Sequence, residues 1–252
     1  MTNIMLYGCN GRMGQVITQM LRDDKTMKIV AGIDEYLGIA NPYPVFSKIE
    51  DCDLEVDVVV DFSIAEGIDA LISYCVARKL PVVLCTTGLS PKQLEAVEEA
   101  SKEIPVLKSA NMSLGINLLL KLVQDVAKVL APAGYDMEIV ERHHNQKVDA
   151  PSGTALVLAD AINDVLEEKY SYVFDRSQAR EKRTSKEIGL SAVRGGTIVG
   201  EHDVIFAGVD EVMELKHTAY SRSVFGKGAI EAARFLAGKP AGWYTMADVI
   251  GG

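Results

Sequence analysis

The stretch "NIMLYGCNGRMGQVITQMLRDD" (residues 3–24) decides the fold. It begins with a short apolar run that reaches a glycine, which predicts a buried strand over 3–8. Apolar residues then recur at helical spacing, which predicts an amphipathic helix over 12–24. The turn between them, "GCNGRMG", spaces its glycines as GxxGxxG. A strand, a glycine-rich turn and a helix together predict the first unit of an open α/β sheet.

The same alternation of strand and helix continues to about residue 111. Helices are predicted over 65–79 and 90–103, and the second has a strong start, a Ser cap followed by Pro91. Such a pattern indicates an α/β fold in which a parallel, doubly wound, Rossmann-like sheet is covered on both faces. The predicted strands are 3–8, 27–34, 56–63, 81–88 and 104–111.

The glycine-rich turn has the residues needed to bind the pyrophosphate of a dinucleotide. Gly8, Gly11 and Gly14 allow a tight bend and a close approach to phosphate, and the following helix offers free N–H groups. The usual fingerprint is GxGxxG, and Asn10 takes its middle place here. An ordinary strand-to-helix turn is the alternative, but an acid at the end of the second strand favours the dinucleotide.

That acid is Asp34, which follows Gly14 by 20 residues. A carboxylate at this point can accept hydrogen bonds from the ribose hydroxyls, although a solvated loop acid would also fit. Glu35 comes next, and two adjacent acids would repel a 2′-phosphate. The sequence therefore favours NADH over NADPH, while Arg12 in the glycine turn could still meet a 2′-phosphate.

Small polar residues close two later strands. "CTTG" (85–88) and "SANMS" (109–113) follow strands whose carboxyl ends lie at the ligand-binding edge of an open sheet. Their hydroxyl and amide groups could line a nicotinamide, or they could serve only as turn and cap residues.

The second half changes character and predicts an α+β domain with a mixed sheet. The polar segment 170–187 is expected to be a solvated excursion, and the two segments after it are expected to form antiparallel strands. We expect a dinucleotide-binding domain (1–113 and 222–252) and a substrate-binding domain (114–221). The predicted order is helix 115–131, strand 137–144, loop 145–151, helix 152–169, the strand segments 189–208 and 210–221, and a last helix over 222–240 with Gly238 as its C-cap.

The segment "EIVERHHNQKVDAPSGTAL" (138–156) crowds polar groups into one strand, loop and helix start. Adjacent histidines chelate metal poorly, and no HxxH or HxxxH partner exists, so no metal is expected. A structural interpretation has His143 and His144 capping a strand and satisfied by Glu141 and Asp149. We favour a third interpretation, in which the loop belongs to an active site that binds an anion.

Two features favour this active-site interpretation. Ser152, Gly153 and Thr154 open a helix whose N–H groups and hydroxyls suit a carboxylate. Lys147 and the two histidines add donors beside it, and histidine exchanges protons near neutral pH. A nucleotide domain joined to such a pocket predicts reduction of a small acidic substrate.

Composition and charge narrow the class of protein. The chain has 252 residues and a net charge of −9, which argues against nucleic-acid and anionic-membrane partners. No apolar run reaches the ~18 residues of a membrane span, and no signal segment is seen, so a cytoplasmic protein is expected. The 4 cysteines show no CxxC spacing and are expected to be reduced and buried.

These motifs resemble the dihydrodipicolinate reductase (4-hydroxy-tetrahydrodipicolinate reductase) family of the diaminopimelate route to lysine. "HHNQKVDAPSGT" is the most specific of them, and "GCNGRMGQ", "DFS", "TTG", "SAN" before "SLGIN" and "GTIVGEH" follow in family order over essentially the whole chain. The resemblance implies NAD(P)H-dependent reduction of 4-hydroxy-tetrahydrodipicolinate to tetrahydrodipicolinate. It also implies a homotetramer assembled through the central domain, which is then an oligomerisation domain as well.

The resemblance implies a role for individual residues. His143 would donate or accept a proton, and Lys147 would be the proton donor. Carboxylate binding falls to His144, Gly153 and Thr154, beside Ser152. The cofactor would be held by Gly8, Cys9, Asn10, Gly11, Arg12 and Met13 at the pyrophosphate, Asp34 at the ribose, and Cys85, Thr86, Thr87, Ser109, Ala110, Asn111 and Met112 at the nicotinamide.

Two positions depart from the family pattern, and two other classes of protein compete. Glu35 stands where the family often has Arg, and Met112 stands where an aromatic residue is common.

A dehydrogenase of aspartate semialdehyde or a related precursor would need a catalytic cysteine in a mobile loop. A protein that only senses dinucleotides would leave the His–His–Lys cluster without a role.

Overall fold

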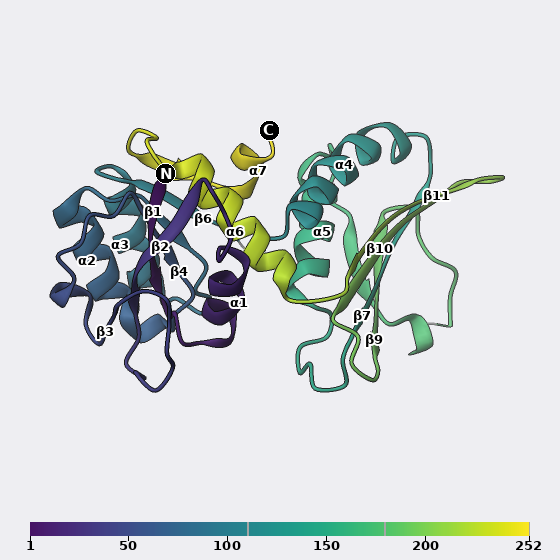
Figure 1. Cartoon of the computed structure of the whole chain (residues 1–252). Coiled ribbons are helices and arrows are strands. Elements are labelled where there is room, and N and C mark those ends of the chain that lie inside the picture. The colour runs from purple at the N-terminus through teal and green to yellow at the C-terminus, as the bar shows by residue number, and fades with distance from the viewer. Residues whose placement is uncertain (110, 179, 252) are drawn as a thin grey trace. The chain divides into compact units, whose positions relative to one another are not determined.

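The computed structural model describes residues 1–109, 111–178 and 180–251. The chain forms two compact units, one from Met1–Leu114 with the segment that begins at Ser223, and one from Gly115–Arg222 (Figure 1). Each unit has its own sheet and its own hydrophobic core. Among the described residues, no helix is both long and apolar enough to cross a membrane.

The first unit is built on a parallel sheet. Its described strands are β1 (Thr2–Tyr7), β2 (Met27–Ile33), β3 (Val45–Phe46), β4 (Val58–Asp61), β5 (Val82–Leu84), β6 (Pro105–Lys108) and β12 (Gly242–Tyr244). Their order is β12-β6-β5-β4-β1-β2-β3, and every pair is parallel. The order reverses beside β1, which pairs with both β2 and β4. The predicted doubly wound, Rossmann-like sheet is confirmed.

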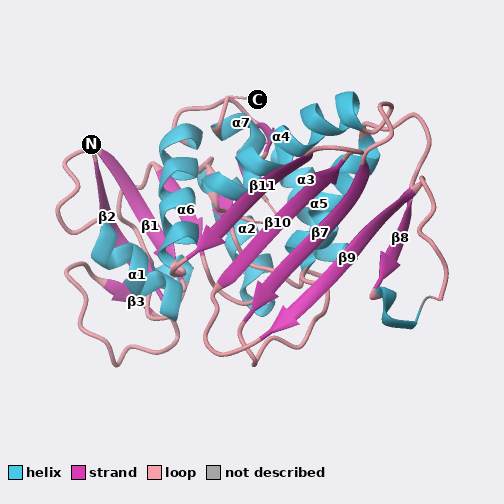
Figure 2. Ribbon diagram, turned by 90° about the vertical axis from the view of Figure 1, so that its right-hand side faces the viewer, coloured by secondary structure: helices cyan, strands magenta, loops and turns pink. Residues whose placement is uncertain are grey.

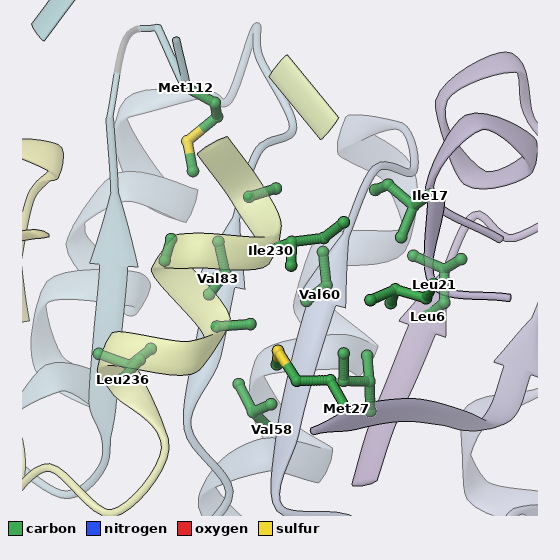
Figure 3. Close-up of a cluster of buried hydrophobic side chains, with 14 of the residues drawn as sticks. Leu6, Ile17, Leu21, Met27, Val58, Val60, Val83, Met112, Ile230 and Leu236 are labelled. Carbon is green, nitrogen blue, oxygen red and sulfur yellow. The ribbon is translucent and has the colours of Figure 1, made fainter. Parts of the chain in front are cut away.

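Alternating side chains of β1 show how both faces of this sheet are covered. Ile4 and Leu6 belong to a core that includes α1 and α6, whereas Met5 belongs to a core that includes α2 and α3. Figure 3 shows the first core, with Leu6, Ile17 and Ile230 in one cluster. The helices are α1 (Arg12–Met20), α2 (Ile68–Arg78), α3 (Pro91–Ser101), α6 (Ser223–Leu236) and α7 (Met246–Val249), with short 3-10 turns at Ile49–Asp51 and Ala65–Gly67.

Backbone contacts explain two glycines of the turn after β1. Gly8 has φ +81°, and a Cβ there would lie 2.5 Å from the carbonyl oxygen of Phe62. At Gly14 a Cβ would lie 2.3 Å from the carbonyl oxygen of Gly8, because α1 packs directly on the turn. The close approach of helix and strand therefore requires glycine, whether or not a dinucleotide is bound.

The second unit contains a mixed sheet covered on one face by two helices. Its described strands are β7 (Asp136–His143), β8 (Ser171–Phe174), β9 (Glu187–Arg194), β10 (Gly200–Ala207) and β11 (Val212–Ala219), in the order β11-β10-β7-β9-β8. Helices α4 (Leu114–Leu130) and α5 (Gly153–Asp164) pack on the face that carries Met137, Ile139 and Phe206. Figure 2 shows the opposite face of the sheet, with both helices behind it. The predicted mixed sheet is confirmed.

Two predictions for this unit were wrong. The segment 170–187 is more than a solvated excursion, because it contains β8 and a short 3-10 turn at Arg176–Gln178. Its charges are paired: Arg176 and Arg183 lie against the carboxylates of Glu138 and Glu187. Only β10 and β11 form the predicted antiparallel pair, since β9 lies parallel to β7 and β8.

Helix α5 ends at Asp164, before the predicted end at residue 169. The side chain of Asn163 makes hydrogen bonds to both the N–H and the carbonyl oxygen of Tyr170, at 2.8 and 2.9 Å. Lys169 Nζ donates to the carbonyl oxygen of Asn163 at 2.9 Å. These bonds satisfy the last turn of the helix and direct the chain into β8.

Replacing Gly14 tests the packing of α1 on the turn. We expect Gly14→Ala to lower the free energy of unfolding by roughly 2–3 kcal/mol, because the new methyl would overlap backbone that cannot easily move. Urea unfolding followed by circular dichroism measures this. Gly195→Ala is the control, since no atom lies within 4 Å of its added Cβ. Equal stability of the two variants would contradict the packing argument.

Candidate functional site

A crevice opens in the first unit where the strand order reverses. Its volume is about 310 Å³, and its lining comes from the ends of β1, β2 and β4. Open α/β sheets bind ligands at such a reversal, outside the carboxyl ends of the strands. The described lining residues are Tyr7, Gly8, Gly11, Ile33, Asp34, Glu35, Ser47, Phe62, Ser63, Ile64, Glu66 and Gly67.

The start of α1 suits an anion. The helix begins after Gly11 without a side-chain cap and without an acid in its first turn. Its first N–H groups therefore carry the positive end of the helix dipole without internal compensation. Gly8 and Gly11 line the crevice beside this helix start. These residues fit the pyrophosphate of a dinucleotide.

Asp34 and Asn10 hold the turn in shape. The carboxylate of Asp34 accepts hydrogen bonds from the N–H groups of Asn10 (2.9 Å) and Tyr36 (3.0 Å). The Asn10 side chain donates to the carbonyl oxygen of Tyr36 and accepts from Asn41. Asn10, in the middle place of the fingerprint, thus ties the glycine turn to the loop after β2. Arg12 is exposed, Met13 is partly buried, and the side chain of Cys9 is buried in the core.

A buried acid organises the neighbouring strand ends. Asp61 at the end of β4 accepts from the N–H and hydroxyl of Ser63 and from the N–H of Thr86. Burial raises the pKa of Asp61, although these hydrogen bonds oppose the rise. The carboxylate therefore joins the "DFS" and "TTG" turns, a connection that spacing alone did not predict.

The residues predicted to line the nicotinamide differ in exposure. Thr87 is exposed, Ser109, Asn111 and Cys85 are partly buried, and Thr86 and Met112 are buried. The Met112 side chain packs in the core shown in Figure 3. Ala110 lies outside the described residues. The contact of this set with a nicotinamide stays a prediction.

In the second unit, one face of the sheet changes from apolar to polar along β7. Met137 and Ile139 contribute to the core, and Glu141 and His143 continue on the same face. His202 lies directly opposite Glu141 on β10, and His217 lies opposite His202 on β11. The buried face of the sheet therefore ends in a cluster of titratable groups.

Glu141 is the centre of this cluster. It is fully buried, and Arg194 binds it with two parallel bonds of 2.7 Å. The same carboxylate contacts His143 Nδ1 at 2.7 Å and accepts from the N–H of Ser152 at 2.9 Å. Burial alone would raise the pKa of Glu141, but the hydrogen bonds from Arg194, His143 and Ser152 lower it.

The loop after β7 carries Lys147 against an internal acid. Lys147 Nζ lies 2.8 Å from the carboxylate of Asp149. Gly153, the first residue of α5, lies four residues further along the chain. The Lys147 charge and the Gly153 N–H together lower the pKa of Asp149. A carboxylate of the chain itself thus already pairs with Lys147, one of the groups of the predicted anion site.

The remaining predicted residues lie around the same loop. Ser152 caps α5 by accepting from the Ala155 N–H, and its hydroxyl lies 3.0 Å from His202 Nε2. His144 follows the last residue of β7, and its buried Nδ1 has no hydrogen-bond partner among the described residues. Thr154 lies in the first turn of α5. The structure therefore brings the whole predicted set together on one strand, loop and helix start.

Arg194 and His202 belong to this cluster but were missed in the sequence. His202 lies in the quoted motif "GTIVGEH", to which no role was given, and Arg194 immediately precedes "GG" in the same stretch. Glu141 was considered only as a structural partner of His143, and that contact exists. No group of three or more His, Cys, Asp or Glu that could hold a metal ion occurs among the described residues.

The fold and the two sites define a Rossmann-type oxidoreductase with a separate α+β unit. The chain belongs to the dihydrodipicolinate reductase family, because the model of that family's N-terminus matches residues 2–112 and the model of its C-terminus matches residues 115–250.

Individual relatives agree with the family models. The chain is 54% identical over 250 residues to 4-hydroxy-tetrahydrodipicolinate reductase of Caldanaerobacter subterraneus subsp. tengcongensis. The aligned residues cover 99% of this chain and 98% of that protein. The corresponding protein of Clostridium tetani is 53% identical, with coverage of 98% and 96%. Dipicolinate-bound dihydrodipicolinate reductase from Paenisporosarcina sp. TG-14 has the same fold, with a TM-score of 0.80, 23% identity and 97% coverage of both chains.

The burial of His202 predicts a loss of stability in acid. Burial, and next the nearby His143, lower the pKa of His202 from 6.5 to about 4. The unfolded chain therefore binds a proton before the folded one, and stability present above pH 6.5 is lost as the pH falls toward 4. We expect this loss to reach roughly 3 kcal/mol.

Comparison with His202→Gln isolates this contribution. Urea unfolding at several pH values between 7 and 4 should give a steeper fall for the wild type than for the variant. Carboxylates titrate in both proteins, so only the difference in slope reports His202. Identical slopes would show that His202 is accessible to protons in the folded chain.

Proposed function

We propose that this chain reduces 4-hydroxy-tetrahydrodipicolinate to tetrahydrodipicolinate with a nicotinamide dinucleotide, a step of the diaminopimelate route to lysine. The observation that carries the proposal is 54% identity over 99% of the chain to a protein named for this activity. The cluster of His143, Lys147 and the α5 helix start supports it, because a cyclic dicarboxylate needs both anion-binding groups and a proton source.

The first unit binds the dinucleotide in this proposal. Bound NADH or NADPH would supply the hydride. The start of α1, with Gly8 to Met13, holds the pyrophosphate, and Asp34 accepts from the ribose. Asp34 keeps acceptor capacity for this, since each of its oxygens accepts only one hydrogen bond from the described protein. Asp61 holds the Ser63 and Thr86 turns, which orients the residues beside the nicotinamide.

The second unit binds the dicarboxylate and moves the proton. Lys147, His144 and the N–H groups of Gly153 and Thr154 receive the carboxylates. A substrate carboxylate would take the place that Asp149 holds beside Lys147. Reduction with loss of water leaves an enamine carbon that needs a proton, which Lys147 delivers. His143 serves as donor or acceptor beside it.

The acids of the crevice support a preference for NADH. Among its described lining residues, Asp34, Glu35 and Glu66 are acids, and none is basic. A 2′-phosphate on the adenosine ribose would approach these carboxylates and be repelled. We therefore propose NADH as the better cofactor.

We also propose that the chain assembles as a homotetramer. Figure 2 shows the face of the five-stranded sheet that α4 and α5 leave open. The strand register places Val193 and Val212 on this face, and they are 45% and 59% exposed. Apolar side chains on an open sheet face favour burial against another copy. Sedimentation equilibrium of the purified chain would show the assembly.

A coupled turnover assay tests the proposed activity. Substrate made in situ from pyruvate and aspartate semialdehyde is offered with NADH and with NADPH. Cofactor oxidation is followed by the loss of the near-ultraviolet absorbance of the reduced nicotinamide. We expect oxidation only when substrate is present. Lys147→Met should lower kcat/KM by roughly 100-fold, since a positioned proton donor is lost.

Lys128→Met is the control for that variant, because Lys128 is exposed and, within the described part of the chain, its one ion pair is with Asp125 on α4. It should retain wild-type turnover. If the wild type oxidises neither cofactor in response to substrate, the proposed function is wrong.

Changing Glu35 tests the proposed cofactor preference. We expect Glu35→Arg to raise the ratio of kcat/KM for NADPH over NADH by roughly tenfold or more, since a charge-assisted contact to the 2′-phosphate replaces repulsion. Glu35→Gln should give a smaller rise because it only removes the repulsion. A ratio unchanged in both variants would show that the acids of the crevice do not select the cofactor.

A further inference from the structure

We propose that Glu141 is a positioning residue that holds His143 in its Nδ1–H tautomer and so leaves Nε2 as the nitrogen that exchanges the proton with substrate. This inference rests on the proposed function, in which His143 takes part in proton transfer.

The argument begins with the contacts of the two carboxylate oxygens of Glu141. Oε1 accepts from Arg194 Nη2 at 2.7 Å and from the Ser152 N–H at 2.9 Å. Oε2 accepts from Arg194 Nη1 at 2.7 Å and lies 2.7 Å from His143 Nδ1. The guanidinium and the backbone N–H can only donate. Of these partners, only the imidazole can either donate or accept at the atom that faces Glu141, according to its tautomer.

An ionised carboxylate can only accept hydrogen bonds. With three donors fixed on it, Glu141 has no proton to offer to His143, so Nδ1 must carry one. A neutral imidazole has a single N–H, and Nε2 then bears the lone pair. A free histidine side chain favours the opposite tautomer, so the contact with Glu141 changes what His143 presents.

The surroundings of the ring agree with this orientation. The His202 ring packs edge-on against His143, with centroids 5.2 Å apart and planes at 74°. On the Nε2 side stands Gly200, where an added Cβ would lie 3.1 Å from that atom. Glycine at this position leaves room for the His143 ring. Glu141 holds that ring at Nδ1, and the His202 ring packs against it in a T-shaped arrangement.

Arg194 extends the same arrangement to the rest of the site. Besides its two bonds to Glu141, its Nη2 donates to the carbonyl oxygen of Asp149 at 2.6 Å. Glu141 in turn holds the N–H of Ser152, the cap of α5. The pair of buried Glu141 and partly buried Arg194 therefore fixes the ring of His143, the loop that carries Lys147 and the start of α5.

Glu141→Gln separates this role from a purely structural one. The amide NH2 of Gln cannot replace Oε1, because two fixed donors point at that place. It takes the place of Oε2, which faces one fixed donor, Arg194 Nη1, instead of two, and where His143 can become an acceptor. The variant should therefore invert His143 to the Nε2–H tautomer while keeping the shape of the side chain.

The tautomer is read directly by nitrogen NMR. The chain has only 4 histidines, so ¹⁵N-histidine labelling with His→Gln variants assigns each ring. At alkaline pH, where histidines are neutral, the wild type should show His143 protonated at Nδ1 and Glu141→Gln should show it protonated at Nε2. A wild type protonated at Nε2 would overturn the proposal, even if the variant fails to fold.

Kinetics provide the second readout. We expect Glu141→Gln to lower kcat by roughly 100-fold with little change in KM, because the groups that bind the carboxylates remain. Arg194→Lys leaves Glu141 ionised, so it should keep the wild-type tautomer of His143 and mainly raise KM through the loosened Asp149 loop. An unchanged kcat in Glu141→Gln despite an inverted tautomer would overturn the proposal.

A matched control lies on the same strands. Arg142 and Glu201 form an ion pair between β7 and β10 on the other face of the sheet, with Arg142 Nη1 3.4 Å from Glu201 Oε2. Arg142→Met should keep wild-type kcat, KM and tautomer. Urea unfolding followed by circular dichroism checks that the second unit of each variant is folded. If the wild type turns over no substrate, the proposed function fails, whereas the NMR result still decides whether Glu141 sets the tautomer.

Discussion

The pair between Glu141 and Arg194 is the interaction on which the polar end of the second unit depends. A charge in the low-dielectric interior is tolerated only when it is paired and hydrogen-bonded, and removing one partner of such a pair typically costs about 3–5 kcal/mol. Glu141 meets this condition with donors on both oxygens. By contrast, Lys79 and Glu103 are both more than half exposed, and such a pair contributes about 0–1 kcal/mol. The pair formed by buried Glu141 consequently fixes its neighbours, whereas the surface pair does not.

The first unit depends on a different constraint, the contact of backbone with backbone. Helix α1 begins so close to the turn after β1 that side chains at positions 8 and 14 would overlap carbonyl oxygens. The groups offered to a ligand there are mainly N–H groups held rigid by this contact. In the second unit they are mainly side chains held by one another. The two units therefore prepare their sites by packing in one case and by charge pairing in the other.

Local patterns predicted the elements that depend on local causes. Alternation of apolar strands with helices gave the doubly wound sheet, and the Ser90 cap with Pro91 gave the start of α3. The neighbours of a strand are a nonlocal property, which is why the segments 189–208 and 210–221 were expected to form antiparallel strands although β9 pairs in parallel with β7 and β8. The charges of 170–187 were assigned to solvent for the same reason, since their partners Glu138 and Asp136 lie on a distant strand.

The candidate site was predictable to the extent that one segment carries it. The block 138–156 contains the histidines, Lys147 and the start of α5, so its residues were found together without knowledge of the fold. Arg194 is 53 residues from Glu141 along the chain, and only the parallel pairing of β7 with β9 brings them into contact. Arg194 stands at the end of a predicted strand beside two glycines, and nothing in the neighbouring sequence indicates a distant acidic partner. The roles of the site residues are predictions that await the experiments above.

The internal carboxylate of Asp149 has a consequence for selectivity. It is tethered two residues from Lys147, so it competes with any external anion at a high effective concentration. A ligand with one carboxylate would replace the contact between Lys147 and Asp149 with an equivalent one, so its binding would be only weakly favourable. A ligand with a second carboxylate brings an interaction that Asp149 cannot match, and it alone profits from the exchange. Under the proposed function, the site would therefore select dicarboxylates over single carboxylates, and Lys147 would keep an anionic neighbour before and after the ligand binds.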